Sequence, residues 1–151
     1  MLVYRIAKKK SRSTDLSGIG AYTEGGRWNN PGVYALYTSE NRALAALEVL
    51  VHLDESELPS NLSIMTIEIR AGAPIYEVPD SALPPDWRTP ENIALKTMGD
   101  RILTSNQFAG IKVRSAVMPE EYNVVLNPLF PDFTRLVKVI KVEDYEADER
   151  L

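Results

Sequence analysis

Apolar and polar residues alternate along several short stretches of this chain, the pattern of half-buried β-strands. Residues 62–70 show it clearly, with Met65, Ile67 and Ile69 on one face and polar residues between them. Leu2, Tyr4 and Ile6 share one face in the same way. This pattern predicts strands at residues 2–7, 33–38, 62–70, 74–78 (a short edge strand), 111–117, 122–126 and 136–142.

Two segments instead carry helical signals. Residues 40–53 place apolar side chains nearly all round a helical cylinder, which predicts a buried helix capped by Thr38 or Ser39. Thr89-Pro90-Glu91 combines a cap, a proline and an acid, which predicts a second helix running to residue 104. The polar segments 8–32 and 80–88 are predicted loops, and Tyr22 and Trp28 favour an ordered first loop.

The order of these elements predicts the fold class. Strands outnumber helices and do not alternate with them regularly, which favours an α+β fold with a mixed, mostly antiparallel sheet and flanking helices. A chain of 151 residues corresponds to one domain, residues 1–151. The acidic tail, residues 146–151 above all, is expected to fray.

Composition removes several classes of function. The chain has no cysteine and one histidine, which excludes disulfides and thiolate chemistry and argues against a metal site. A net charge of -4 argues against general nucleic-acid binding, although Lys8-Lys9-Lys10 with Arg12 is a local basic run. The simpler interpretation of that run is a solvated loop. No signal peptide or membrane-spanning run is recognisable, so we expect a soluble cytoplasmic protein.

Glu48 is the first candidate for chemistry, because a carboxylate inside an apolar helix needs a partner or a purpose. It could form a structural ion pair with Arg27 or Arg114, or it could serve a ligand, and the sequence leaves both interpretations open. His52, the single histidine, is more typical of a packing or hydrogen-bonding residue than of a catalytic one.

Glycines precede the second candidate, Arg27. Gly25-Gly26 allows a tight turn in which a ligand can approach the backbone, and a guanidinium suits phosphate. A plain turn with a solvated arginine is the simpler interpretation of these three residues alone. Neither a dinucleotide fingerprint nor a phosphate-binding P-loop is present. Trp28 is interpreted as a core anchor.

Polar residues also interrupt the later strands. Ser115 is either a satisfied core hydroxyl or a donor to a ligand, and no hydrolase triad surrounds it. Asn123 and Asn127 flank the next strand, where one is expected to be a polar cap and the other a ligand contact.

Together these motifs resemble the RES-domain toxin family, named for an arginine, a glutamate and a serine that Arg27, Glu48 and Ser115 match here. Other blocks match in order from about residue 4 to residue 142; they are Gly18-x-Gly20-Ala21, Gly25-Gly26-Arg27-Trp28-Asn29, Pro31-Gly32, Leu36-Tyr37-Thr38-Ser39, Ala43-Leu44-Ala45, Leu47-Glu48, His52, Val113-Arg114-Ser115 and the asparagines Asn123 and Asn127. Residues 55–106 carry little of the family's signature.

The resemblance implies a toxin of a type II toxin–antitoxin module that depletes NAD, with a fold like that of ADP-ribosylating toxins. It implies NAD as substrate rather than as a bound prosthetic group, and an Xre-type helix-turn-helix antitoxin as partner. The acceptor of the ADP-ribosyl group, which could be water, phosphate or a protein side chain, stays open, as does homodimerisation. The alternatives are a protein ADP-ribosyltransferase, a non-catalytic nucleotide-binding module, and a transferase acting on RNA, which the acidic charge disfavours.

On this hypothesis Glu48 stabilises positive charge on the ribose, Arg27 binds the diphosphate and Tyr37 stacks beside the nicotinamide. Ser115 is expected to donate a hydrogen bond to the ribose or the carboxamide. The weaker candidates for the same NAD pocket are Asn127, Tyr22 and His52, and whether Asn123 contacts the ligand is left open.

Overall fold

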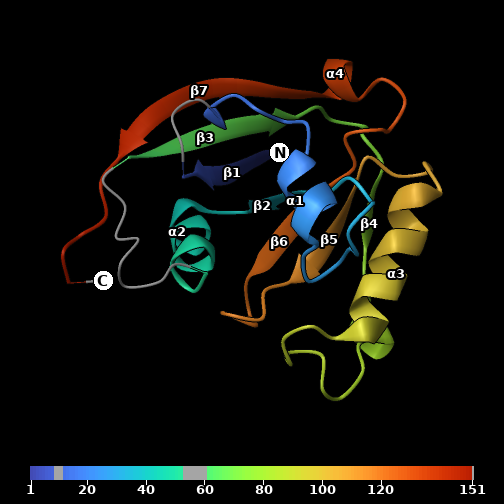
Figure 1. Ribbon diagram of the computed structural model, residues 1–151. Coiled ribbons are helices and arrows are strands. Elements are labelled where there is room, and N and C mark those ends of the chain that lie inside the picture. Colours follow the sequence, from blue (N-terminus) through green and yellow to red (C-terminus); the bar gives the residue numbers. More distant parts are fainter. Residues whose placement is uncertain (9–11, 53–60, 151) are drawn as a thin grey trace.

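The computed structural model describes residues 1–8, 12–52 and 61–150 (Figure 1). Its centre is a seven-stranded sheet with the order β4-β5-β6-β2-β1-β3-β7. The elements follow the chain as β1 (Leu2–Ala7), α1 (Ile19–Glu24), β2 (Leu36–Ser39), α2 (Arg42–Leu50), β3 (Leu62–Ile69), β4 (Ile75–Glu77), η3 (Asp80–Ala82), α3 (Ile93–Thr104), β5 (Gly110–Arg114), β6 (Tyr122–Leu126), α4 (Phe133–Leu136) and β7 (Val137–Tyr145). Within the described residues, β4 and β5 are the one parallel pair of neighbours. The predicted α+β fold with a mixed, mostly antiparallel sheet is therefore confirmed.

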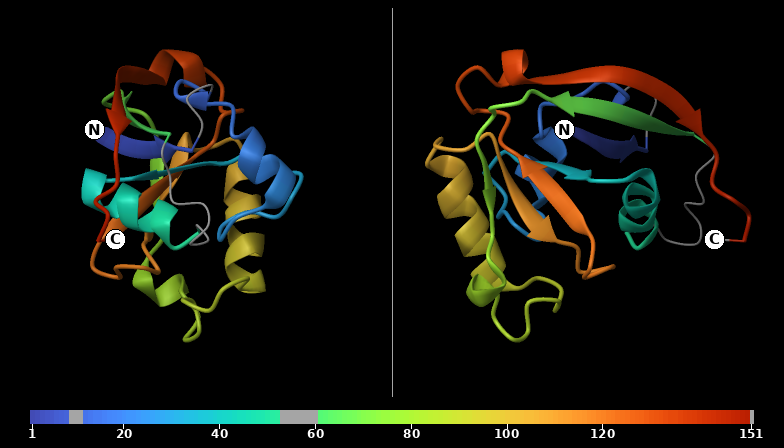
Figure 2. Two further views of the ribbon diagram at one scale, coloured as in Figure 1. Left: turned by 60° about the vertical axis from the view of Figure 1, so that its left-hand side comes forward. Right: turned by 180° about the vertical axis from the view of Figure 1, so that it is seen from behind.

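Two helices cover opposite ends of the same face of this sheet. Directly paired residues lie on one face, and the pairs Tyr37↔Val125 and Ile111↔Val125 place these side chains under α3, whose Leu95 and Leu103 they pack against. The pair Ile6↔Ile64 on that same face packs against Ala45 of α2. Figure 2 shows α2 and α3 standing apart at the two ends of the sheet. The row of residues between them is where polar side chains gather.

The other face of the sheet holds the largest apolar core. Val3, Met65 and Leu126 are fully buried there, in one apolar cluster with the last residue of β3, the first residue of β7 and Phe133 of α4. In Figure 1, β3 and β7 cross the top of the molecule while β5 and β6 run steeply below. The sheet is thus strongly bent, and its buried side supplies rigidity to the polar row on the opposite side.

The helix predicted at residues 40–53 is shorter and less buried than its apolar pattern suggested. It runs from Arg42 to Leu50 and is capped by the Asn41 side chain, which accepts from the Leu44 N–H, so the predicted cap at Thr38 or Ser39 is wrong. Leu44 and Ala45 are its buried residues. The buried-helix prediction is wrong because a single sheet face covers this helix, and Leu53 lies outside the described residues.

The ends of other helices and strands also differ from the predicted ones. Asn92, not Thr89, caps α3, because its side chain accepts from the Leu95 N–H. Helices α1 and α4 were not predicted, since each is a short turn of helix within a predicted loop or strand boundary. Strand β7 extends to Tyr145, into the acidic tail. No helix of the described chain has the length and apolarity needed to cross a membrane.

Candidate active site

The carboxylate of Glu48 reaches from α2 to the sheet and is held there by two donors. The Ser115 hydroxyl donates to Glu48 Oε1 over 2.6 Å, and the Asn123 amide Nδ2 donates to the same oxygen over 2.7 Å. Glu48 is half-buried. Among the described residues nothing hydrogen-bonds to the second oxygen, Oε2. The arrangement presents a carboxylate whose position is fixed through one oxygen and whose other oxygen is left for a ligand.

Ser115 is oriented by the turn that follows β5. Its Oγ accepts hydrogen bonds from the backbone N–H groups of Val117 and Met118, each at 3.1 Å, and the residue is fully buried. Because two donors already point at this oxygen, its own proton is directed to Glu48. Ser115 therefore acts on the carboxylate, and its hydroxyl has no exposed face with which to meet a ligand.

Asn123 is oriented in the same manner from the next strand. The buried Ser39 hydroxyl donates to Asn123 Oδ1 over 2.7 Å, and the register pairs these two residues across β2 and β6. A carbonyl oxygen that is occupied by Ser39 leaves the amide nitrogen to face Glu48. Ser39 had been considered only as a helix cap, because the sequence shows no sign of a cross-strand contact.

Arg27 approaches this cluster from the loop after α1. Its Nη1 donates to the backbone carbonyls of Trp87 and Thr89 at 3.1 and 3.2 Å. Partial burial lowers the pKa of the Arg27 guanidinium, while the negative charge of Glu48 raises it more than the other charged groups nearby. The arginine and the carboxylate therefore share one electrostatic environment, although they make no direct ion pair among the described residues.

The loop that carries Arg27 is built around the phenol of Tyr37. The Tyr37 hydroxyl donates to Asn29 Oδ1 over 2.7 Å and accepts from the Trp28 N–H over 2.9 Å. Gly26 packs so tightly on the phenol that a Cβ there would lie 2.5 Å from its oxygen. Burial raises the pKa of Tyr37 well above its ordinary value. Tyr37 thus shapes the loop, and its hydroxyl is already committed.

Helix α3 holds the same loop from outside. The ammonium of the buried Lys96 donates a hydrogen bond to the carbonyl of Gly26. The carboxylate of Asp100 accepts hydrogen bonds from the backbone N–H and the side-chain amide of Asn30, at 2.9 and 2.7 Å. Trp28, fully buried beneath α3, is the core anchor that the sequence predicted. These contacts fix the position of the loop backbone from which the Arg27 side chain extends.

Replacing Gly99 by Ala tests how closely α3 and this loop are packed. A Cβ at Gly99 would lie 1.7 Å from the Trp28 carbonyl oxygen, so the helix or the loop must shift. We expect the free energy of unfolding to fall by about 1–3 kcal/mol, as for other overpacked sites. Denaturant titration measures this change. The exposed Thr97→Ala variant in the same helix is the control. Without the close contact, the higher helix propensity of alanine would stabilise the protein instead, by up to about 1 kcal/mol.

Several predicted site residues lie elsewhere. Asn127 sits at the opposite end of β6 from Asn123, where its buried amide donates to the Leu103 carbonyl and to Asn106. The structure thus separates the two asparagines and brings Asn123, not Asn127, to Glu48. The sequence could not choose between them, because each stands at an end of the same strand.

Aromatic and histidine candidates are also outside the cluster. Tyr22, an exposed residue of α1, stacks on Tyr34 with ring centroids 4.2 Å apart. His52 is exposed just after α2. Arg114, considered above as a structural partner of Glu48, instead pairs with Asp80 at 2.6 Å. Lys9 and Lys10 of the basic run lie outside the described residues.

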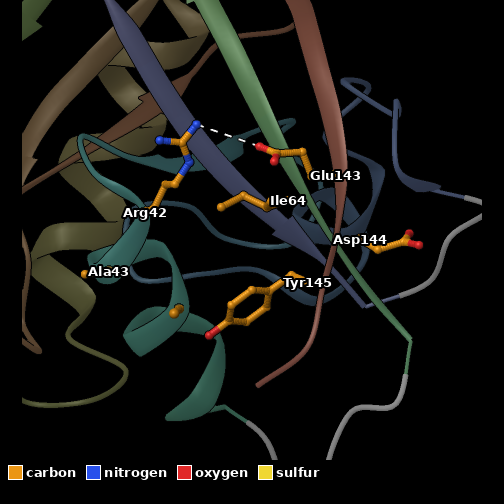
Figure 3. Close-up of a pocket in the computed structure, with 7 residues that line it drawn as sticks. Arg42, Ala43, Ile64, Glu143, Asp144 and Tyr145 are labelled. Carbon is orange, nitrogen blue, oxygen red and sulfur yellow. Dashed lines mark ion pairs between the residues drawn. The ribbon is translucent and has the colours of Figure 1, made fainter. Parts of the chain in front are cut away.

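Two hollows on the surface do not coincide with this cluster. One, of about 320 Å³, lies between α2 and the end of β7, where Arg42 and Glu143 approach to 3.8 Å (Figure 3). The other, of about 730 Å³, is lined by residues such as Tyr34, Leu129 and Phe133. Neither is lined by Arg27, Glu48 or Ser115. Within the described chain, no group of His, Asp or Glu side chains could hold a metal ion.

Comparison with known proteins gives consistent matches along the whole chain. Residues 2–148 match the family described as RES domain. A protein named Toxin Res from Photorhabdus laumondii subsp. laumondii is 35% identical, over 100% of this chain and 97% of the relative. The Prs ADP-ribosylating toxin of a Sphingobium species is 36% identical, over 91% of this chain and 86% of the relative. A chain in the crystal structure of the M. tuberculosis MbcT–MbcA toxin–antitoxin complex shares the fold, with a TM-score of 0.72 at 19% identity, over 96% of this chain and 84% of that one.

Proposed function

The chain belongs to the RES domain family, and on that premise we propose that it is an NAD-consuming toxin of a toxin–antitoxin module. One observation carries the proposal: Glu48 is held by Ser115 and Asn123 through a single carboxylate oxygen, within the electrostatic reach of Arg27. A fixed negative charge beside a cation suits a ligand that carries phosphates and develops positive charge during its reaction.

The proposed reaction breaks the bond between nicotinamide and ribose. The electron pair of that bond goes to the ring nitrogen, which leaves as neutral nicotinamide, and positive charge develops on the ribose. The free Oε2 of Glu48 stabilises this charge by facing the anomeric carbon or by accepting hydrogen bonds from the ribose hydroxyls. An oxygen or nitrogen of the acceptor then bonds to the same carbon, and an acceptor atom that carries a proton releases it to water.

The other residues take supporting roles in this proposal. Arg27 binds the diphosphate, with the guanidinium nitrogens that Trp87 and Thr89 leave unused. Ser115 and Asn123 position the carboxylate, since their hydrogen bonds end on it. Tyr37 positions the Arg27 loop, and any stacking on nicotinamide must use the part of its ring that Gly26 leaves uncovered.

The partner in this proposal is an antitoxin of the Xre helix-turn-helix type, as the resemblance implies, which silences the toxin by covering the site or by inserting a segment into it. The protein then acts in the cytoplasm, where both NAD and the antitoxin would be met. The relative named an ADP-ribosylating toxin raises protein side chains as a possible class of acceptor besides water and phosphate.

An NAD consumption assay on the purified protein, with and without inorganic phosphate, tests the function. We expect NAD to disappear and nicotinamide to be released in equal amount. ADP-ribose indicates water as acceptor, ADP-ribose-1''-phosphate indicates phosphate, and label transferred from NAD to lysate proteins indicates a protein acceptor. NAD that binds without turnover would instead support a non-catalytic module and overturn the proposal.

A further inference from the structure

A second arginine stands at the rim of the Glu48 cluster, in a segment where the sequence showed no functional signal. Arg88 lies between the two residues whose carbonyls hold Arg27, because Trp87 and Thr89 both accept from Arg27 Nη1. The Arg88 side chain is exposed and its Nε donates to the carbonyl of Ala116 over 2.9 Å. Ala116 directly follows Ser115, so Arg88 connects the segment that holds Arg27 to the turn that orients Ser115.

Arg27 and Arg88 are neighbours in space, because Arg27 is hydrogen-bonded to the residues on both sides of Arg88. The positive charge of Arg88 lowers the pKa of Arg27, in the same direction as burial. Neither arginine forms an ion pair with a carboxylate of the described residues. Glu91, which also acts on Arg27, lies 3.3 Å from the ammonium of Lys96. Glu48 and Glu91 are the carboxylates that act on Arg27, and neither forms an ion pair with it, so an anion placed between the two guanidinium groups would reduce their mutual repulsion.

The hydrogen bonds of Arg88 leave its ends available for that anion. Nε is its one side-chain nitrogen with a partner among the described residues, so both Nη groups of this exposed side chain keep their donors free. Arg27 likewise uses Nη1 for the loop carbonyls. Two planar guanidinium groups, each with free donors, match two linked phosphates better than one group does.

From this geometry we propose that Arg88 and Arg27 together form the subsite for the diphosphate of NAD, with Arg88 as a residue that determines specificity for the diphosphate. The proposal rests on the proposed function, since it assigns a part of the same ligand. Arg88 contacts no group of the Glu48 cluster directly, so its role is in binding and not in bond cleavage.

Kinetics of the Arg88→Ala variant with NAD, and equilibrium binding of ADP-ribose, test this subsite. We expect KM for NAD and Kd for ADP-ribose to rise about tenfold, the effect of losing one hydrogen bond to a charged group. The kcat should stay within about twofold of wild type, and the salt dependence of ADP-ribose binding should weaken. Arg88→Lys, which keeps the charge, should recover part of the affinity.

Two controls separate binding from structure. Arg101→Ala removes another exposed arginine, on α3, and should leave KM unchanged. Nicotinamide riboside has no phosphate, so the kcat/KM for its cleavage should be the same in Arg88→Ala as in wild type. If Arg88→Ala lowered kcat/KM equally for NAD and for nicotinamide riboside, Arg88 would serve only to stabilise the Ser115 turn, and the proposed subsite would be overturned.

The outcomes also distinguish this subsite from the proposed function. Wild-type protein that neither binds nor consumes NAD overturns both. Wild-type protein that consumes NAD, together with an Arg88→Ala variant of unchanged KM and unchanged ADP-ribose affinity, overturns the subsite alone. Thermal unfolding of each variant verifies that a change in KM is measured on folded protein.

Discussion

Glu48→Gln is expected to lower the rate of NAD consumption at saturating NAD by about 10²–10³, the loss typical of removing one preorganised electrostatic group. Glutamine keeps an oxygen that can still accept from Ser115 and Asn123, whose hydrogen bonds end on Oε1. What is lost is the negative charge and the free second oxygen. The fold should therefore persist while the ribose cation loses its stabilisation.

The rate is measured from the disappearance of NAD, and the thermal midpoint of unfolding is measured on the same samples. Glu24→Gln is the matched control, because Glu24 is an exposed glutamate at the end of α1. It should leave both quantities unchanged. A Glu48→Gln protein that consumes NAD at nearly the wild-type rate would remove this residue from the mechanism.

Arg27→Ala is expected to raise KM for NAD by about 10- to 100-fold, since hydrogen bonds to charged groups contribute about 1.5–3 kcal/mol. The thermal midpoint should fall only modestly, because the lost bonds to Trp87 and Thr89 are partly exposed to solvent. The KM of Arg27→Lys should lie between the values of wild type and Arg27→Ala, since an ammonium keeps the charge but lacks the planar geometry of the guanidinium group.

Steady-state kinetics and thermal unfolding together decide how Arg27 is used. If Arg27→Ala changes only the thermal midpoint and leaves KM at the wild-type value, then this arginine serves to tie the loop to residues 87–89. That result would favour the interpretation of Gly25-Gly26-Arg27 as a structural turn, which the sequence alone had left open.

Much of the site could be anticipated from residue types and their order. Glu48 stood out because a carboxylate in an apolar helix is costly unless it is satisfied, and the structure supplies the satisfying donors in Ser115 and Asn123. The glycines before Arg27 were by themselves better explained by a plain turn, and the family resemblance made this arginine a candidate. The strands were predictable because side chains alternate between two faces of a sheet.

Other parts depended on contacts between segments far apart in the chain. The apolar pattern of residues 40–53 suggested burial on all sides, yet α2 packs on one sheet face and Val51 is 56% exposed. An apolar side chain can be buried, but its hydrophobicity does not determine how many neighbouring residues cover it in the fold. The helix caps at Asn41 and Asn92 were missed because stronger local signals stood nearby.

From the amino-acid order alone, local periodicity predicted the α+β class, and the resemblance of motifs along the chain predicted the family and made Arg27, Glu48 and Ser115 candidate site residues. Strand register was needed to choose Asn123 over Asn127 and to turn Ser39 toward Asn123, and loop contacts were needed to set Arg88 near Arg27. Those choices depend on which residues face each other across hydrogen-bonded strands and folded loops, and separation along the chain carries no such information.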